Sequence, residues 1–215
     1  PGKDGWELPG TLTLPEGEGP FPAVILVHGS GTNDRDETIG PNKPFRDLAW
    51  GLAEKGIAVL RYDKRTYVYQ KEMITETNLT LYDETVDDAV SAVNVLLGEE
   101  NIDSSRIFML GHSLGGEALP RIHNELTEGE KEAAGYIFMA APARPASVSM
   151  KEQLDLLYAL SPSLTKEQEA QKEQSYVWLK QLENINEQPD DAVLFGAYAY
   201  YWKDLESYDP VAEAS

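Results

Sequence analysis

The sequence has no cysteine, only three histidines and no long apolar run. The absence of cysteine excludes disulfides and thiolate metal sites. No apolar run approaches the roughly 18 residues that span a bilayer, and the chain does not open with the basic and apolar regions of a secretory signal. Because the first residue is proline rather than methionine, we expect that an upstream segment was removed. The compartment, cytoplasmic or secreted, therefore stays open.

Basic residues are also scarce, since 18 lysines and arginines stand against 37 acidic side chains, for a net charge of −19. Nucleic acids and anionic membranes need clustered positive charge, so neither is expected as a partner. An acidic, well-solvated surface explains this charge. Steering of cationic substrates is an alternative that nothing else in the sequence supports. We expect no cofactor and no metal site.

Glycine, in contrast, is concentrated in one informative hexapeptide, Gly111–Gly116, which reads GHSLGG. It follows an apolar run at 107–110 and precedes a helical pattern, so the order is strand, G-x-S-x-G, helix. Such a turn strains the backbone of Ser113 to lift its hydroxyl clear of the sheet, and it needs Gly111 and Gly115 because side chains there would collide. The amides that open the next helix face a developing oxyanion. Ser113 is thus the predicted nucleophile; the alternative is an ordinary turn between strand and helix.

A second motif supports that interpretation. The strand-like run Ala23–Val27 leads straight into His28–Gly31, which reads HGSG. An oxyanion loop lies at this place, after the strand that precedes the first core helix. We therefore expect the backbone N–H groups of Leu114 and Ser30 to be the oxyanion donors, with Gly31 as an alternative to Ser30.

Several segments together resemble bacterial α/β-hydrolases of the dienelactone hydrolase and acyl-esterase kind. They are His28–Gly31, the polar loop Thr32–Pro44, Arg61–Arg65, Gly111–Gly116 and the stretch Tyr201–Pro210. The resemblance covers nearly the whole chain. It implies a serine hydrolase that cleaves small-molecule esters through a Ser-Asp-His triad and an acyl-enzyme, with Ser113 as nucleophile.

Alternating strand and helix patterns from residue 22 to 141 predict an α/β fold with a mostly parallel sheet, right-handed crossovers and flanking helices. We expect buried strands at 22–28, 57–60, 107–110 and 136–140. We expect helices at 45–55, 79–97 and 114–126, the last one kinked by Pro120. Residues 6–15 alternate apolar and polar side chains and predict an antiparallel edge strand, where Pro9 is tolerated.

After residue 147 the pattern becomes helical. Segments 150–160, 165–187 and 190–205 predict helices with no strand among them, and in an α/β-hydrolase such a stretch is a cap. We therefore divide the chain into a hydrolase core over 1–147, an all-helical cap over 148–208 and the start of a return to the core over 209–215. The aromatic cluster around Tyr201 and Trp202 predicts a pocket for an apolar or aromatic substrate group, with packing as the alternative.

The charged residues Asp63, Lys64 and Arg65 follow a buried strand, at the edge where open α/β sheets bind ligands. An ion-pair network that holds the neighbouring loop explains them. Substrate contact by Arg65 is the alternative.

The sequence lacks a recognisable general base, which a serine hydroxyl needs. In this fold the acid and the histidine follow the serine, but the only later histidine, His123, lies about 15 Å further along the helix. His28 and His112 are expected to be structural, and about five of the family's usual eight strands are found. We therefore expect the last core strands, the acid and the histidine beyond residue 215, in a missing C-terminal segment or a second chain. The present chain alone is expected to be inactive and to associate through the strand at 136–140.

Other functions stay open at this point. One is a binding protein that keeps the fold without the chemistry. Another is a thioesterase or a peptidase that uses the same constellation on a different acyl bond.

Overall fold

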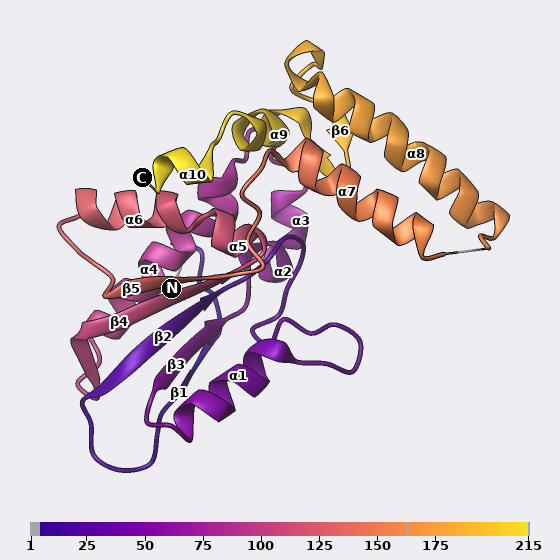
Figure 1. Ribbon diagram of the computed structural model, residues 1–215. Helices are drawn as coiled ribbons and strands as arrows, with labels where there is room; N and C mark the ends of the chain where they lie inside the picture. Colours follow the sequence, from indigo (N-terminus) through magenta and orange to yellow (C-terminus); the bar gives the residue numbers. More distant parts are fainter. Residues whose placement is uncertain (1–4, 162, 215) are drawn as a thin grey trace.

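The computed structural model describes residues 5–161 and 163–214 and has one central sheet (Figure 1). Its five strands are ordered β1-β3-β2-β4-β5, and only the β1–β3 pair is antiparallel. The strands are β1 (Gly10–Thr13), β2 (Phe21–Val27), β3 (Ala58–Tyr62), β4 (Ile102–His112) and β5 (Gly135–Met139). This confirms the predicted α/β fold and the antiparallel edge strand.

The unbroken apolar runs of β2 and β3 are buried because helices cover both faces of a parallel sheet. Successive side chains of a strand point to opposite faces. Val24 and Leu26 of β2 accordingly form one core cluster with Phe45 and Ala49 of α1 (Pro44–Ala53). Ile25 and Val27 belong to a larger cluster on the other face. Two further helices cover that face, α4 (Asp87–Leu97) and α6 (Leu119–Glu128).

Two predicted helices are less regular than their apolar spacing indicated. The helix expected over 79–97 opens with a π-helical turn, η2 (Tyr82–Val86), before α4 begins. The helix after Ser113 is divided into α5 (Leu114–Glu117) and α6, with Pro120 in the first turn of α6. The break at Ala118 agrees with the predicted effect of proline, which cannot continue the hydrogen-bond ladder. Two short helices, α2 (Arg65–Val68) and α3 (Gln70–Met73), follow β3.

The C-terminal third is mostly helical, but the prediction that it contains no strand is wrong. Its elements are α7 (Ala146–Ala159), α8 (Lys166–Glu183), the 3-10 turn η3 (Ile185–Glu187), β6 (Val193–Leu194), β7 (Ala197–Tyr198), α9 (Ala199–Glu206) and α10 (Pro210–Glu213). In Figure 1, α7 and α8 run side by side and project away from the sheet, while α10 lies beside α6.

A short β-hairpin replaces the first half of the helix expected over 190–205. β6 and β7 pair antiparallel, and the turn between them is formed by Phe195 (φ 49°) and Gly196 (φ 84°). Two successive residues with positive φ make the tight turn that fits the twist of a hairpin, and glycine adopts this conformation without strain. The helical spacing of the aromatic residues concealed this turn.

Strand β5 forms one edge of the sheet, since β4 pairs with it on one side only among the described residues. Ile137 and Phe138 of β5 are 45% and 53% exposed. The strand expected at 136–140 is therefore present, but the expectation that it is buried is wrong for the described residues. In the described part of the chain, no helix is both long and apolar enough to cross a membrane.

Candidate active site

Ser113 occupies the junction between β4 and α5, with φ 52° and ψ −120°. A positive φ at this junction was predicted, and it is confirmed. The Ser113 N–H donates to the Met139 carbonyl at 3.0 Å, and the Ser113 carbonyl accepts from the N–H groups of Gly116 and Glu117 at 2.9 and 3.0 Å. The turn is therefore held by β5 on one side and by the start of α5 on the other. Ser113 itself is half-buried.

Three glycines allow this turn because backbone packs directly on backbone around it. A Cβ at Gly111 would lie 2.3 Å from the Gly115 carbonyl oxygen, and a Cβ at Gly115 would lie 2.3 Å from that of Val27. At Gly116 a Cβ would lie 2.5 Å from Cβ of Ala141. The roles predicted for Gly111 and Gly115 agree with this packing. Gly116 has the same restriction, which follows from its contact with the segment after β5 and not from the motif.

The loop after β2 passes directly beside Ser113. A Cβ at Gly29 would lie 3.3 Å from Cβ of Ser113. Side chains hold the polar groups of this loop: Glu37 Oε1 accepts from the Gly29 N–H at 2.8 Å, and Asn33 Nδ2 donates to the carbonyls of Gly29 and Ser30, both at 3.1 Å. Ser30 is exposed. The structure thus brings the two predicted motifs together, at the carboxyl ends of adjacent strands.

Glu37 is a buried residue of this site that the sequence did not reveal. It is 2% exposed and has φ 51°. Its Oε2 atom lies 2.9 Å from Nδ1 of His112, although the two are not aligned as a hydrogen bond. Because the Glu37 carboxylate accepts a hydrogen bond from the Gly29 N–H, it lowers the free-energy cost of burying that polar group next to Ser113. One feature of the sequence pointed to it, namely the length of the polar loop at 32–44.

The charged residues after β3 form the ion-pair network that was one of the two interpretations. Arg35 donates to both oxygens of Asp63 at 2.8–2.9 Å, and Arg65 donates to both oxygens of Asp88 at 2.6 and 3.0 Å. Arg61 and Lys43 both pair with Asp36. These pairs join the loop at 32–44 to the end of β3 and to α4. Arg65 is 5% exposed and lies outside the pocket, so the structure does not support substrate contact by Arg65.

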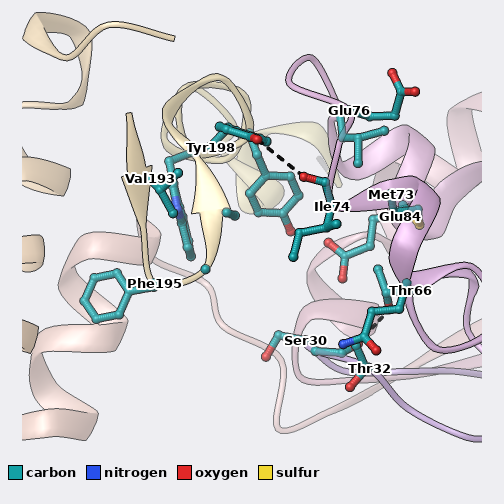
Figure 2. A pocket seen from close by; sticks show the side chains of 17 residues that line it. Ser30, Thr32, Thr66, Met73, Ile74, Glu76, Glu84, Val193, Phe195 and Tyr198 are labelled. Carbon is teal, nitrogen blue, oxygen red and sulfur yellow. Dashed lines mark hydrogen bonds between the residues drawn. The ribbon is translucent and has the colours of Figure 1, made fainter. Parts of the chain in front are cut away.

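A pocket of about 530 Å³ opens beside the loop that follows β2 (Figure 2). The β6–β7 hairpin and α9 form one wall, and the segment from Thr66 to Glu84 forms the other. Ser30, Tyr201 and Trp202, all predicted site residues, line it, whereas Ser113 and Leu114 are not among its lining residues. Trp202 is fixed by a hydrogen bond from Nε1 to the Leu194 carbonyl at 2.8 Å.

The lining of the pocket is mainly apolar and aromatic, with few polar groups. Met73, Ile74 and Phe195 lie around it, and the Tyr198 hydroxyl donates to the Ile74 carbonyl at 3.4 Å across the gap between the walls. Burial, together with the nearby Glu84 carboxylate, raises the pKa of Tyr201 well above its usual value. Tyr201 is therefore a neutral hydrogen-bonding group at any physiological pH.

Two of the three histidines, His28 and His123, have hydrogen-bond partners away from the Ser113 hydroxyl. His28 Nε2 donates to the Asp34 carbonyl at 3.1 Å, and burial lowers the pKa of His28 to about 3, so this ring is neutral. His123 Nδ1 lies 3.1 Å from the Tyr136 hydroxyl. In the parts of the chain that the structure describes, no hydrogen bond joins the Ser113 hydroxyl to a histidine. The same residues contain no group of three or more histidine or acidic side chains arranged to hold a metal ion.

Glu117, four residues after Ser113, is a second buried carboxyl that sequence reasoning missed. It is 3% exposed, and its Oε1 atom has no hydrogen-bond partner among the described residues. Burial, with a smaller contribution from Glu206, raises the pKa of Glu117 to about 7, against the opposing effect of Arg121. The Tyr208 hydroxyl donates to the main-chain carbonyl of Glu117 at 3.0 Å. The last residue of α5 thus carries a carboxyl group whose pKa lies near neutral pH.

Comparison with known proteins agrees with this geometry. The family model described as serine aminopeptidase, S33, matches residues 20–194. Esterase EstD of Thermotoga maritima is 46% identical over 207 residues, which are 96% of this chain and 46% of that protein. The chain therefore spans about half the length of this curated relative.

Solved structures share the fold. A bacterial heroin esterase is 25% identical with a TM-score of 0.52, over 70% of this chain and 46% of that one. The α/β hydrolase GrgF from Penicillium sp. sh18 is 14% identical with a TM-score of 0.54, over 95% of this chain and 70% of that one. Because the family model covers most of the sequence, and the strained serine and its glycines lie where that fold has its nucleophile elbow, this chain belongs to the serine aminopeptidase S33 family of α/β-hydrolases.

Proposed function

We propose that the protein carrying this chain is a serine hydrolase that cleaves carboxylic esters, with Ser113 as its nucleophile. The observation that supports this most directly is the strained backbone of Ser113, φ 52° and ψ −120°, in a turn where three glycines have no room for a side chain. Strain of this kind costs about 1–3 kcal/mol and persists where a function needs the geometry. The 46% identity to an esterase adds the reaction class.

In the proposed reaction, Ser113 Oγ attacks the carbonyl carbon of the ester while a base takes the hydroxyl proton. The backbone N–H groups of Leu114 and Ser30 donate to the oxyanion of the tetrahedral intermediate. Collapse of the intermediate expels the alcohol, which receives that proton, and leaves an acyl-enzyme. Water then attacks the acyl group, and the carboxylic acid leaves as Ser113 regains its proton.

The general base and its acid are proposed to come from polypeptide outside these residues, either in the same protein or in a second chain. Two observations support this. None of the three histidines bonds to the Ser113 hydroxyl among the described residues. The apolar flank of β5 lies open at the edge of the sheet, where a further parallel strand would pair. We propose that residues 148–208 act as the cap over this site.

An active-site serine probe tests the function directly. The full-length protein is treated with a fluorophosphonate, and the modified residue is located by mass spectrometry. We expect rapid labelling of Ser113 and hydrolysis of 4-nitrophenyl esters, with both lost in Ser113→Ala. A protein that binds ligands but never labels would favour the non-catalytic alternative.

The acyl or alcohol group is proposed to be apolar or aromatic, because most of the pocket lining is apolar. Ala197 on β7 lines the pocket and is half-buried, so Ala197→Leu fills part of its volume. We expect the optimum chain length among 4-nitrophenyl esters to shorten. Trp202→Ala, which enlarges the same wall, is expected to lengthen it. Identical chain-length profiles in all three proteins would assign the aromatic cluster to packing alone.

An aminopeptidase is a second candidate, because the family model carries that description and two carboxylates, Glu76 and Glu84, line the pocket. An α-ammonium group needs an unpaired carboxylate, but Glu84 is paired with Lys64, and Glu76 is exposed to solvent. Esters are therefore favoured. Amino-acid 4-nitroanilides assayed beside 4-nitrophenyl esters decide between the two, since turnover of the anilides at comparable kcat/KM would favour the peptidase.

A further inference from the structure

Lys64 has an unusual environment for a lysine, since it is only 2% exposed. Lysine is almost never buried to this degree unless its charge is paired. Its Nζ atom has two partners, the carboxylate of Glu84 and the carbonyl oxygen of Gly29 at 2.8 Å. The ion pair accounts for the charge. It does not account for the second bond, which lies on the loop beside Ser113.

The bond to Gly29 bears on Ser30 because a peptide group is planar and trans. The Gly29 carbonyl and the Ser30 N–H belong to one peptide plane and point in opposite directions. The carbonyl oxygen accepts from Lys64 Nζ at 2.8 Å and from Asn33 Nδ2 at 3.1 Å, and these two donors fix the direction of the N–H. The plane before it is held as well, since the Gly29 N–H donates to Glu37 at 2.8 Å.

The carbonyls that follow are also held by side chains. Asn33 donates to the Ser30 carbonyl at 3.1 Å, and the Thr66 hydroxyl donates to the Gly31 carbonyl at 2.9 Å. Lys64 is the buried and charged member of this set, and charged hydrogen bonds are about twice as strong as neutral ones. Its main-chain N–H also donates to the Asn33 carbonyl at 3.0 Å. Lys64, just after β3, thus binds the loop through both its side chain and its main chain.

Glu84 extends this arrangement to the pocket wall. It lies in the π-helical turn η2 and reaches into the pocket (Figure 2). The hydroxyl of Tyr201, on α9, lies near its carboxylate. A line of polar contacts therefore runs from the wall formed by α9, through Glu84 and Lys64, to the carbonyl of Gly29.

We propose that Lys64 is a positioning residue that orients the Ser30 N–H toward the oxyanion, and that the Glu84 carboxylate balances the charge of the buried Lys64 ammonium. This inference rests on the proposed function, in which Ser30 is an oxyanion donor. Lys64 touches no substrate in this scheme. It acts on the transition state alone, because the Ser30 N–H bonds most strongly to the oxyanion that develops there.

The test compares two variants of the full-length protein that differ only at Lys64. The first variant, Glu84→Gln, removes the carboxylate that Lys64→Met alone would leave buried without a partner. The second is the double variant Lys64→Met with Glu84→Gln, which also removes the Nζ donor to the Gly29 carbonyl. Between the two, we expect kcat to fall by about 10–100-fold with KM within about twofold, since loss of an oxyanion donor costs about 10²–10³. A trifluoromethyl ketone, whose carbonyl carbon bonds to Ser113 Oγ in a hemiketal adduct with its oxyanion in the hole, should lose affinity by the same factor as kcat.

A matched pair controls for the loss of a buried ion pair. Arg65→Met with Asp88→Asn removes the adjacent pair, which is equally buried and outside the loop. We expect its Tm to fall while kcat and the affinity for the ketone stay within about twofold. Equal kcat and ketone affinity in Glu84→Gln and its double variant would overturn the role of Lys64.

Lys64→Arg decides the question if the double variant does not fold. It keeps the charge for Glu84, but a planar guanidinium cannot occupy the point of the ammonium, so we expect kcat to fall at least about fivefold with KM unchanged. Unchanged kcat in a folded Lys64→Arg protein would refute the proposal. Failure of the proposed function looks different, because the wild-type protein would then show neither fluorophosphonate labelling nor ester turnover.

Discussion

Around Ser113 backbone packs on backbone, whereas in the hairpin of α7 and α8 large apolar side chains face solvent. Three glycines at the elbow leave less than 2.6 Å for a Cβ. In α7, by contrast, Leu156 and Leu157 are 61% and 55% exposed. The turn around Ser113 accepts only glycine at these three positions, so its conformation can be predicted from the sequence. The hairpin of α7 and α8 is fixed mainly near its ends, and its sequence restricts its structure much less.

The largest effect is expected at Ser113 itself. Ser113→Ala removes the nucleophile, so ester turnover should fall by about 10⁶. Ser113→Gly is equally inactive, but it relieves the strained backbone and should be more stable than Ser113→Ala by about 1–3 kcal/mol. Urea unfolding of both inactive variants measures this difference. Equal stabilities would mean that the positive φ of Ser113 stores no strain.

The packing of the elbow is tested by two glycine-to-alanine substitutions. A Cβ at Gly115 would lie 2.3 Å from the Val27 carbonyl oxygen and 2.5 Å from that of His28, so Gly115→Ala should cost more than about 4 kcal/mol or prevent folding. Gly51, inside α1, has nothing within 4 Å of the same point. Gly51→Ala should stabilise the protein by about 0.5–1 kcal/mol. The urea midpoints of the two variants measure these effects. Equal shifts in Gly115→Ala and Gly51→Ala would contradict the expectation that only the site at Gly115 lacks room for a Cβ.

The same contrast explains how much the sequence could predict. The five-stranded sheet and the conformation of Ser113 follow from local patterns, namely unbroken apolar runs and glycines at fixed distances from a serine. The β6–β7 hairpin was missed because Phe195 and Gly196 lie among aromatic residues at helical spacing. A turn and a helix are both compatible with that local pattern, and tertiary contacts decide between them.

The partners of the buried charges could not be predicted for a related reason. Lys64 and Glu84 are 20 residues apart in sequence, and Arg121 and Asp204 are 83 apart. Their pairing depends on which faces of distant elements meet, and a π-helical turn at Glu84 shifts the helical register locally. Sequence indicated that the residues after β3 belong to an ion-pair network. It did not indicate which carboxylate each of them meets.

Glu117 provides a test of the elbow region through pH. Because burial raises its pKa from 4.5 to about 7, the folded protein binds a proton that the unfolded chain has released at pH 5–7. Its contribution to stability is complete below about pH 4.5 and is lost as pH rises through about 7. Glu117→Gln removes this dependence, so relative to wild type it should gain up to about 3 kcal/mol between pH 4.5 and 8.

The control for this measurement is Glu99→Gln, which removes one charge from an exposed position. The free energy of unfolding is measured for both variants and the wild type across pH 4.5–8. Parallel curves for Glu117→Gln and wild type would mean that the Glu117 carboxyl is hydrated in solution.

The smallest effect on stability is expected in the helical hairpin formed by α7 and α8. Leu156 is 61% exposed in α7, and glutamine has a similar helix propensity, so Leu156→Gln should change the free energy of unfolding by less than about 0.5 kcal/mol. Leu182, only 1% exposed in α8, is the matched position, and Leu182→Ala should cost about 2–5 kcal/mol. Urea unfolding at two protein concentrations measures both. A loss above about 1 kcal/mol in Leu156→Gln that grows with protein concentration would show that this face is buried against another copy of the chain, and the hairpin would then be as strongly determined as the elbow.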